Sequence, residues 1–270
     1  MRKKSFYLGM LLLLFTGVAA RAADIVDPTS LACAGQFKLS MEVSYQAGIK
    51  FADTTADASR SLSDGSGLVY QYAVTDLALK RDQYYFLALN YGAMDRLDLF
   101  VKAGVVRGGE KTSGSDSGNY YDLREAFAWA VGGKLRLLEA ANGMSLTLAG
   151  QYLRFDARKQ APSWEIMQER DFKMDHWRAD LDLVGAWRLG CLTPYLGAKY
   201  SYSEAKIYGD VTSVRSGLTQ VTYSEYTARN ATNWGAVAGL AWDINSAFRL
   251  NLQGDFLDDL TTSLSLAYSF

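Results

Sequence analysis

Histidine, cysteine and proline are scarce in this chain of 270 residues, which holds one, two and three of them respectively. One histidine gives no cluster of imidazoles with metal-ligand spacing, and the two cysteines do not form a Cys-x-x-Cys motif. No glycine-rich loop leads into a helical segment, as phosphate-binding sites require. We therefore expect neither a metal nor a cofactor.

Long hydrophobic runs are missing after the first 22 residues, so we expect no membrane-spanning helix, which would need roughly 20 apolar residues. Residues 1–22 open with a basic RKK, continue with a shorter apolar run and close with a small-x-small ARA site. This order predicts a cleaved secretory signal peptide over residues 1–22.

Negative charge is in slight excess, because 24 basic and 29 acidic side chains remain after residue 22. A negative chain offers no attraction for nucleic acid, so no nucleic-acid partner is expected. The 24 glycines and 17 tyrosines indicate strands, turns and aromatic belts. One large β domain would account for the remaining length of about 250 residues.

Alternation with a period of two dominates the chain. From Phe37 to Phe51 apolar side chains take every second position, and polar ones such as Lys38 and Glu42 take the others. This pattern predicts a strand with one apolar and one polar face. About ten such strands are predicted, near Phe37–Phe51, Gln83–Tyr91, Leu97–Arg107, Ala126–Leu138, Met144–Arg154, His176–Leu189, Pro194–Tyr202, Asn233–Ile244, Phe248–Leu257 and Thr261–Phe270.

Connections between these strands alternate in length. Tight turns alternate with long polar segments, and only the last long-side connection, near Asp258–Leu260, is short. Short and long connections alternate when strands run up and down between two rims. The weak alternation of Leu68–Lys80 leaves open whether it lengthens the second strand or adds structure to the first long connection. The long segments are Phe51–Lys80, Gly108–Glu125, Arg158–Asp175 and Gly209–Ala231.

Aromatic residues stand at both ends of several short apolar stretches, as Trp177 and Trp187 do around Leu181. Two aromatic girdles suit the two interfaces of a bilayer, whereas a soluble β-sandwich gives no reason for them. The fold class we predict is a single all-β, up-and-down antiparallel transmembrane barrel. Its parts would be the signal peptide 1–22, a periplasmic segment 23–36 and the barrel 37–270.

The chain closes on SLSLAYSF, which places Leu264, Leu266, Tyr268 and Phe270 on one face. This ending, together with YGAMDRLDLFVKAG (91–104) and LTPYLGAKYS (192–201), resembles the outer-membrane β-barrel families of Gram-negative bacteria. The resemblance implies a place in the outer membrane and a terminal aromatic that the barrel-assembly machinery reads. It specifies a fold and not an activity.

Polar faces would line the lumen if the apolar faces meet lipid. Charges held away from water need partners, and both signs occur, so we expect a network of salt bridges. A barrel of ten strands is close to the size that its own side chains fill, which favours a structural role over a narrow pore. The predicted lumen residues are Lys38, Glu42, Asp98, Lys102, Lys134, Arg136, Arg178, Asp180, Asp182, Arg188, Lys199, Asp243, Arg249 and Asp255.

His176 follows Asp175 at the outer end of a predicted strand. An acid beside a histidine at an outer rim is similar to the omptins, which are ten-stranded outer-membrane proteases, and lipid-modifying barrels also need a His and a Ser. The facing pair of aspartates that omptins use is missing, and neighbouring residues on a strand point to opposite faces. We therefore predict no catalytic residue, with an enzyme that uses His176 as an alternative.

Cys33 precedes the first strand, and Cys191 lies in the tight turn LGCLTP. Both are predicted to face the periplasm, where disulfides persist. A bond between them would require Ala23–Gln36 to cross the mouth of the barrel as a plug, because the two positions lie on opposite sides of the ring. A disulfide and two free thiols both stay open.

The function that the sequence favours is non-enzymatic. We expect a monomeric, small porin-like or structural surface protein whose partners are outer-membrane lipid, lipopolysaccharide and, during insertion, the assembly machinery. An adhesion or receptor barrel is the second alternative. It would act through outer segments such as Gly109–Asn119 and Gly209–Arg229.

Overall fold

The computed structural model describes residues 27–107, 110–112, 121–160, 168–215 and 218–270. The predicted signal peptide therefore lies outside the described residues. The described part folds into one sheet of sixteen strands. It contains no helix long and apolar enough to cross a membrane.

Ten strands close into an antiparallel barrel, as the sequence predicts. Each pairs with the next, and the last returns to the first, where Leu39 lies opposite Tyr268 and Val43 opposite Leu264. In order around the barrel they are β1 (Phe37–Lys50), β5 (Asp82–Met94), β6 (Leu97–Arg107), β9 (Ala126–Glu139), β10 (Met144–Gln160), β11 (Gln168–Trp187), β12 (Leu192–Arg215), β14 (Trp234–Asp243), β15 (Phe248–Phe256) and β16 (Asp259–Ser269).

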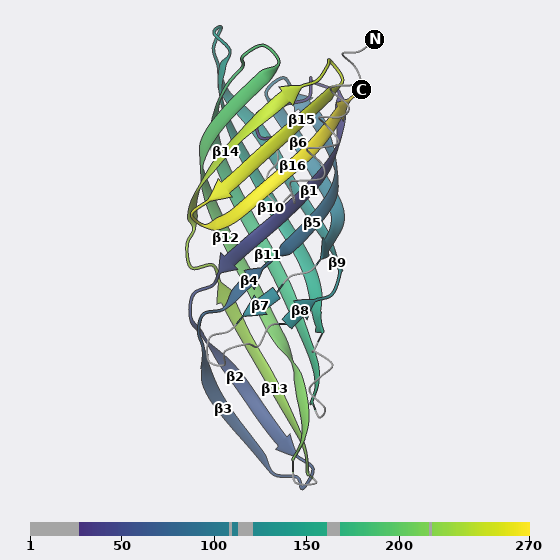
Figure 1. Ribbon diagram of the computed structural model, residues 1–270, viewed down its shortest axis with the longest axis vertical. Coiled ribbons are helices and arrows are strands. Elements are labelled where there is room, and N and C mark those ends of the chain that lie inside the picture. The colour runs from purple at the N-terminus through teal and green to yellow at the C-terminus, as the bar shows by residue number, and fades with distance from the viewer. Residues whose placement is uncertain (1–26, 108–109, 113–120, 161–167, 216–217) are drawn as a thin grey trace, which may run out of the picture.

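The barrel has two unlike rims (Figure 1). We call the rim with the tight turns, including the one at residues 188–191, the inner rim. The opposite end is the outer rim, where β10, β11 and β12 run on for 17, 20 and 24 residues in total. Six further strands belong to this end: β2 (Thr54–Leu62), β3 (Gly67–Val74), β4 (Ala78–Lys80), β7 (Glu110–Thr112), β8 (Tyr121–Leu123) and β13 (Leu218–Arg229).

The connections at the outer rim differ from the polar loops expected for them. Much of Gly209–Ala231 is strand, since β13 pairs with β12 on one side and with β2 on the other. Leu68–Lys80 adds separate structure, because β3 pairs with β2 and β4 pairs with β1 and β7. Alternation does continue through this sheet, but the inward positions carry small residues such as Ala56, Ala58 and Ala228, which weakens the hydrophobic signal.

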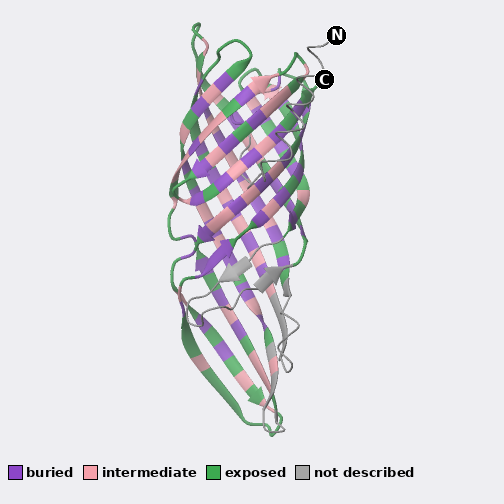
Figure 2. Cartoon of the chain, in the orientation of Figure 1, coloured by how far each residue is buried: buried purple, intermediate pink, exposed green. Residues whose placement is uncertain are grey.

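Apolar side chains cover the outside of the barrel, while polar ones lie buried inside it. Leu87, Leu99 and Leu196 point outward with exposed fractions of 52%, 50% and 67%. Burial alternates along most of the barrel strands, which gives the chequered pattern of Figure 2. This arrangement is the reverse of a soluble protein and is the one that a bilayer stabilises.

An aromatic ladder crosses four neighbouring strands on the outer-rim side of this apolar surface. The ring centroids of Trp129 and Tyr152 are 5.7 Å apart, those of Tyr152 and Trp177 5.9 Å, and those of Trp177 and Tyr202 5.2 Å. On the inner-rim side Phe248 packs against Tyr268 with centroids 5.0 Å apart. Two aromatic levels mark the two interfaces of a bilayer.

Candidate functional site

The lumen is the candidate site, and three layers fill it from one rim to the other. The N-terminal segment Asp27–Gln36 occupies the inner rim, an ionic network follows, and an apolar layer closes the outer half. Ten of the fourteen predicted lumen residues are buried; the other four lie nearer the inner rim. Arg136, Asp243 and Arg249 are partly exposed there, and the Arg188 side chain is 70% exposed at the rim rather than in the lumen.

The first layer is held by hydrogen bonds between lumen side chains and the N-terminal segment. Lys134 Nζ donates to the carbonyl oxygen of Asp27 at 2.8 Å, and the amide of Ala32 donates to Asp98 Oδ2 at 2.7 Å. Lys38 and Arg136 donate to the carbonyl oxygens of residues 30 and 29. These four charged residues therefore anchor a plug, where the sequence suggested pairing only across the lumen.

Asp27 is the main charged anchor of the plug. Its carboxylate is buried and accepts a hydrogen bond from Arg249 Nε at 2.8 Å, and Arg249 also binds Asp243 at 2.7 Å. Burial opposes ionisation of this carboxyl, but Arg249, Lys38 and Lys134 outweigh it and hold the pKa of Asp27 well below its usual range. Asp27 therefore carries its charge at every physiological pH.

Acid should release this anchor only at very low pH. Because the folded pKa of Asp27 is depressed, its contribution to stability is complete above the unfolded pKa of about 3.9 and is lost as pH falls towards the folded value. We expect Asp27→Asn to lower the free energy of unfolding by about 1–3 kcal/mol between pH 4 and 7. Urea titrations should show that the difference in unfolding free energy between the wild type and Asp27→Asn narrows below pH 4. A difference that vanishes already at pH 6 would contradict this assignment.

Gly92 lets the plug lie against β5. Its amide donates to the carbonyl of Gln36 at 3.0 Å, and its own carbonyl accepts from the amide of Gly35 at 2.7 Å. A Cβ at this position would overlap the carbonyl oxygen of Cys33. The close approach of two backbones therefore requires glycine here.

Replacing Gly92 should unseat the plug. We expect Gly92→Val to remove two backbone hydrogen bonds, which destabilises the closed position by about 1–3 kcal/mol, and to speed hydrogen exchange at Gly35 and Gln36. Gly185→Ala is the matched control, since the nearest atom to its added Cβ lies 3.8 Å away. Unchanged exchange in the valine variant would show that the segment is not held in this way.

Cys33 and Cys191 are free, exposed thiols. Both line one cavity of about 660 Å³ at the inner rim, together with Arg136, Arg188 and Arg249. The N-terminal segment thus crosses the mouth without a disulfide to hold it there.

The second layer is an ionic network between β11, β12 and the β15–β16 turn. Arg178 binds Asp180 at 2.6 Å and Asp259 at 2.7 Å, and Lys199 lies 3.5 Å from both Asp258 and Asp259. All of these side chains are at most 2% exposed. Asp258 and Asp259 were missed by the sequence analysis, which placed them in the short connection before Thr261, whereas Asp259 already begins β16.

Further pairs fill the same level of the lumen. Glu42 and Lys102 form a buried ion pair at 2.7 Å, and Asp255 lies 3.7 Å from Lys199. Asp182 is buried as well, at 1% exposure. Tyr195 donates to Asn251 or Gln253, whose side-chain oxygens lie 3.0 and 2.9 Å from its hydroxyl. The described residues hold no group of three or more His, Cys, Asp or Glu placed to bind a metal.

The third layer is apolar and lies on the outer-rim side of the ionic network. Strands β1 to β6 and β9 to β13 all contribute to it. Five of its large side chains are at most 1% exposed: Leu79, Tyr84, Phe155, Met174 and Ile207. Leu77 adds to the layer from the link between β3 and β4, where its carbonyl accepts a hydrogen bond from the amide of Phe51 at 2.9 Å. Close-packed apolar side chains disfavour water in this layer.

His176 lies within this layer and has a partner that the sequence analysis missed. Its Nε2 is 2.9 Å from Ser203 Oγ, and the histidine ring packs against Phe155 with centroids 4.7 Å apart. The register of β11 on β12 brings the two together diagonally: Ala205 lies opposite His176, and Ser203 is two residues before Ala205 on the same face. His176 is fully buried and Ser203 is 1% exposed, while Asp175 points outward to Arg154 at 2.8 Å.

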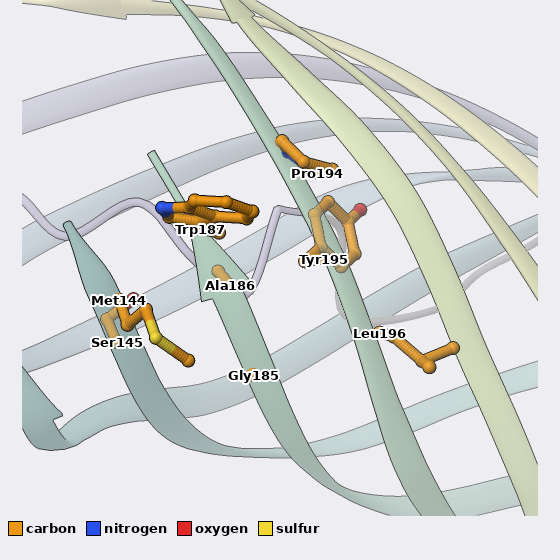
Figure 3. A pocket seen from close by; sticks show the side chains of 8 residues that line it. All are labelled: Met144, Ser145, Gly185, Ala186, Trp187, Pro194, Tyr195 and Leu196. Carbon is orange, nitrogen blue, oxygen red and sulfur yellow. The ribbon is translucent and has the colours of Figure 1, made fainter. Parts of the chain in front are cut away.

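One apolar hollow faces outward, at the inner-rim ends of β10, β11 and β12 (Figure 3). Its volume is about 330 Å³, and Met144, Trp187 and Leu196 line it with exposed side chains. It lies on the lipid-facing surface, so a lipid chain would fill it. No charged side chain lines it.

No family model and no curated protein matches this chain. Among solved structures, it is similar to the outer membrane protease OmpT from Escherichia coli, at 13% identity over 90% of this chain and 100% of that one, with a TM-score of 0.48. It is also similar to the outer membrane protein OprG from Pseudomonas aeruginosa, at 13% identity over 88% of this chain and 97% of that one, with a TM-score of 0.45. An outer membrane channel from Pseudomonas putida F1 is 12% identical over 92% of this chain and 100% of that one, with a TM-score of 0.41.

These similar structures differ in what their names say they do, since one is a protease and another a channel. Identities of 12–13% and TM-scores below 0.5 carry no assignment of activity. The architecture is established by the strand pairing and the apolar outer surface of the chain itself. The protein has the fold of an outer-membrane β-barrel.

Proposed function

We propose that this protein is a closed, non-enzymatic scaffold in the bacterial outer membrane, which acts through the sheet beyond its outer rim and not as a pore. The inner rim then faces the periplasm and the outer rim the surroundings. The observation that carries the proposal is the filled lumen: a bound N-terminal segment, a buried ionic network and an apolar layer follow one another along the same axis.

Solute flux tests the proposal. Liposomes that contain the refolded protein should swell in a small sugar no faster than protein-free liposomes, because water has no continuous path through the apolar layer. Heat-modifiable gel migration shows that the barrel is folded in the same sample. Swelling that depends on the folded protein would overturn the scaffold proposal in favour of the porin-like one.

A second candidate, a serine hydrolase, is favoured by the contact of His176 Nε2 with Ser203 Oγ. A nucleophilic serine is activated when a neighbouring histidine accepts the proton of its hydroxyl group. Two observations weigh against it: both residues are buried inside the apolar layer, and no described side chain bonds to His176 Nδ1 to orient the ring.

A fluorophosphonate probe separates the two candidates. Such a probe labels an accessible, activated serine, so the scaffold proposal predicts that the folded protein stays unlabelled, like Ser203→Ala. Labelling that disappears in both Ser203→Ala and His176→Gln would establish the hydrolase instead. His176→Gln keeps a polar group near Ser203, and the barrel should fold with it.

A further inference from the structure

β3 is an unguarded edge of the outer sheet. Among the described residues it pairs only with β2, and the strand order of the sheet ends at it. Its sequence, GLVYQYAV, has no charged residue and no proline. Natural proteins block such edges with lysine, proline or a covering element, because the free N–H and C=O groups accept another strand.

The side chains of β3 are open on both faces. Leu68 and Val69, which point to opposite sides, are 57% and 80% exposed, and Tyr72 is 39% exposed. Only the base of the β2–β3 hairpin, at Ala56 and Val74, belongs to the apolar layer, and the rest of β3 stands clear of it. The hairpin lies at the tip of the molecule, at the end farthest from the C-terminus (Figure 1). A partner can reach an edge at this place without lying beside the protein in the same membrane.

The sequence of β3 is complementary to itself in antiparallel pairing. With Tyr70 on the two-fold axis, Tyr70 faces Tyr70, Leu68 faces Tyr72, and Val69 faces Gln71 of the second strand. Aromatic–aromatic and aromatic–aliphatic cross-strand pairs stabilise a sheet, and like charges, which would oppose it, are missing from this strand. A second copy of the same edge is thus a fitting occupant.

The symmetry of that pairing fixes how two barrels are oriented. A two-fold axis perpendicular to the sheet reverses the strand direction and keeps each face on its own side. Because the strands of the outer sheet run roughly along the barrel axis, the same rotation turns the second barrel upside down (Figure 1). The two barrels then lie in opposite membranes that face each other and not side by side in one.

We propose that β3 pairs antiparallel with β3 of a second copy in a facing outer membrane, so that the protein joins two membrane surfaces. This inference rests on the proposed scaffold function, since it needs the outer sheet to be displayed. Four or more residues on each strand would bond through the backbone, which is strand addition between identical edges.

Nanodiscs that each hold one full-length barrel test the proposal. Light scattering after size exclusion should show pairs of discs for the wild type, joined tip to tip in negative-stain images. Discs with Val69→Lys alone, or with Val69→Glu alone, should give only single discs. Mixing the two should restore pairs, because Val69 and its counterpart lie diagonally across the pairing, within reach of long side chains.

The matched controls are Thr219→Lys and Thr219→Glu. Thr219 is exposed near the same tip, but it lies on β13, which is paired on both sides. These controls should pair like the wild type. Single discs from the wild type, pairs that survive Val69→Lys, or a mixture that stays single would each overturn the proposal. A folded barrel that gives no solute flux in liposomes made from the same protein would leave the scaffold function standing.

Discussion

Arg178→Met should destabilise the barrel by about 3–5 kcal/mol, since it leaves the buried carboxylates of Asp180 and Asp259 without their closest cation. The reason lies in desolvation: a buried charge that loses its partner keeps the full cost of its removal from water. Methionine fills most of the volume of arginine, so packing changes little. The measurement is the urea unfolding midpoint and slope in bilayers or micelles.

Arg229→Met is the matched control for this prediction. Arg229 binds Glu204 at 3.0 Å, but its side chain is 65% exposed, so its loss should leave the urea unfolding midpoint nearly unchanged. Replacing the two carboxylates as well, in Arg178→Met/Asp180→Asn/Asp259→Asn, should recover part of the stability. Equal effects of Arg178→Met and Arg229→Met would show that the network is hydrated and not buried.

Opening a conducting path should require changes in two layers at once. Deleting residues 27–36 empties the inner rim but leaves the apolar layer in place, so we expect no current. Tyr84→Ser/Phe155→Ser thins the apolar layer, where the two rings lie 6.1 Å apart, but leaves the plug bound. The combined variant should show stepwise openings, because water can then enter from both sides.

Heat-modifiable migration must show that each variant is folded, because removing two buried aromatic rings costs about 3–5 kcal/mol each. Phe127→Ser is a useful control, since Phe127 points outward with 66% exposure and does not touch the lumen. Openings after deletion of residues 27–36 alone would mean that the apolar layer does not seal the barrel.

Strand periodicity predicted the ten-stranded barrel because a lipid-facing strand must be apolar on one side over its whole width. The same rule failed for the strands beyond the outer rim. There β13 exposes residues such as Thr227 and Arg229 to water and buries Ala228, so neither face is distinctly hydrophobic. Polar alternation of this kind looks like a loop when only hydrophobicity is considered.

Contacts between distant positions were beyond prediction from the sequence. Asp27 and Arg249 are 222 positions apart, and nothing in the pattern around Asp27 shows that this segment enters the barrel. Ser203 looks like its serine neighbours until the register of β11 on β12 places it beside His176. The charges themselves could be assigned to the inward face, but their partners depend on shear and register, which alternation does not specify.

The most direct test of the sealed lumen is single-channel recording from the intact, folded protein in a planar bilayer, beside Lys102→Ala/Arg136→Ala. The account predicts a flat baseline for the wild type and for the variant. The two substitutions lie on the inner-rim side of the apolar layer and leave that layer whole. Steady, stepwise openings in the wild type that change in the variant would contradict it, and would show that the charged lumen carries current.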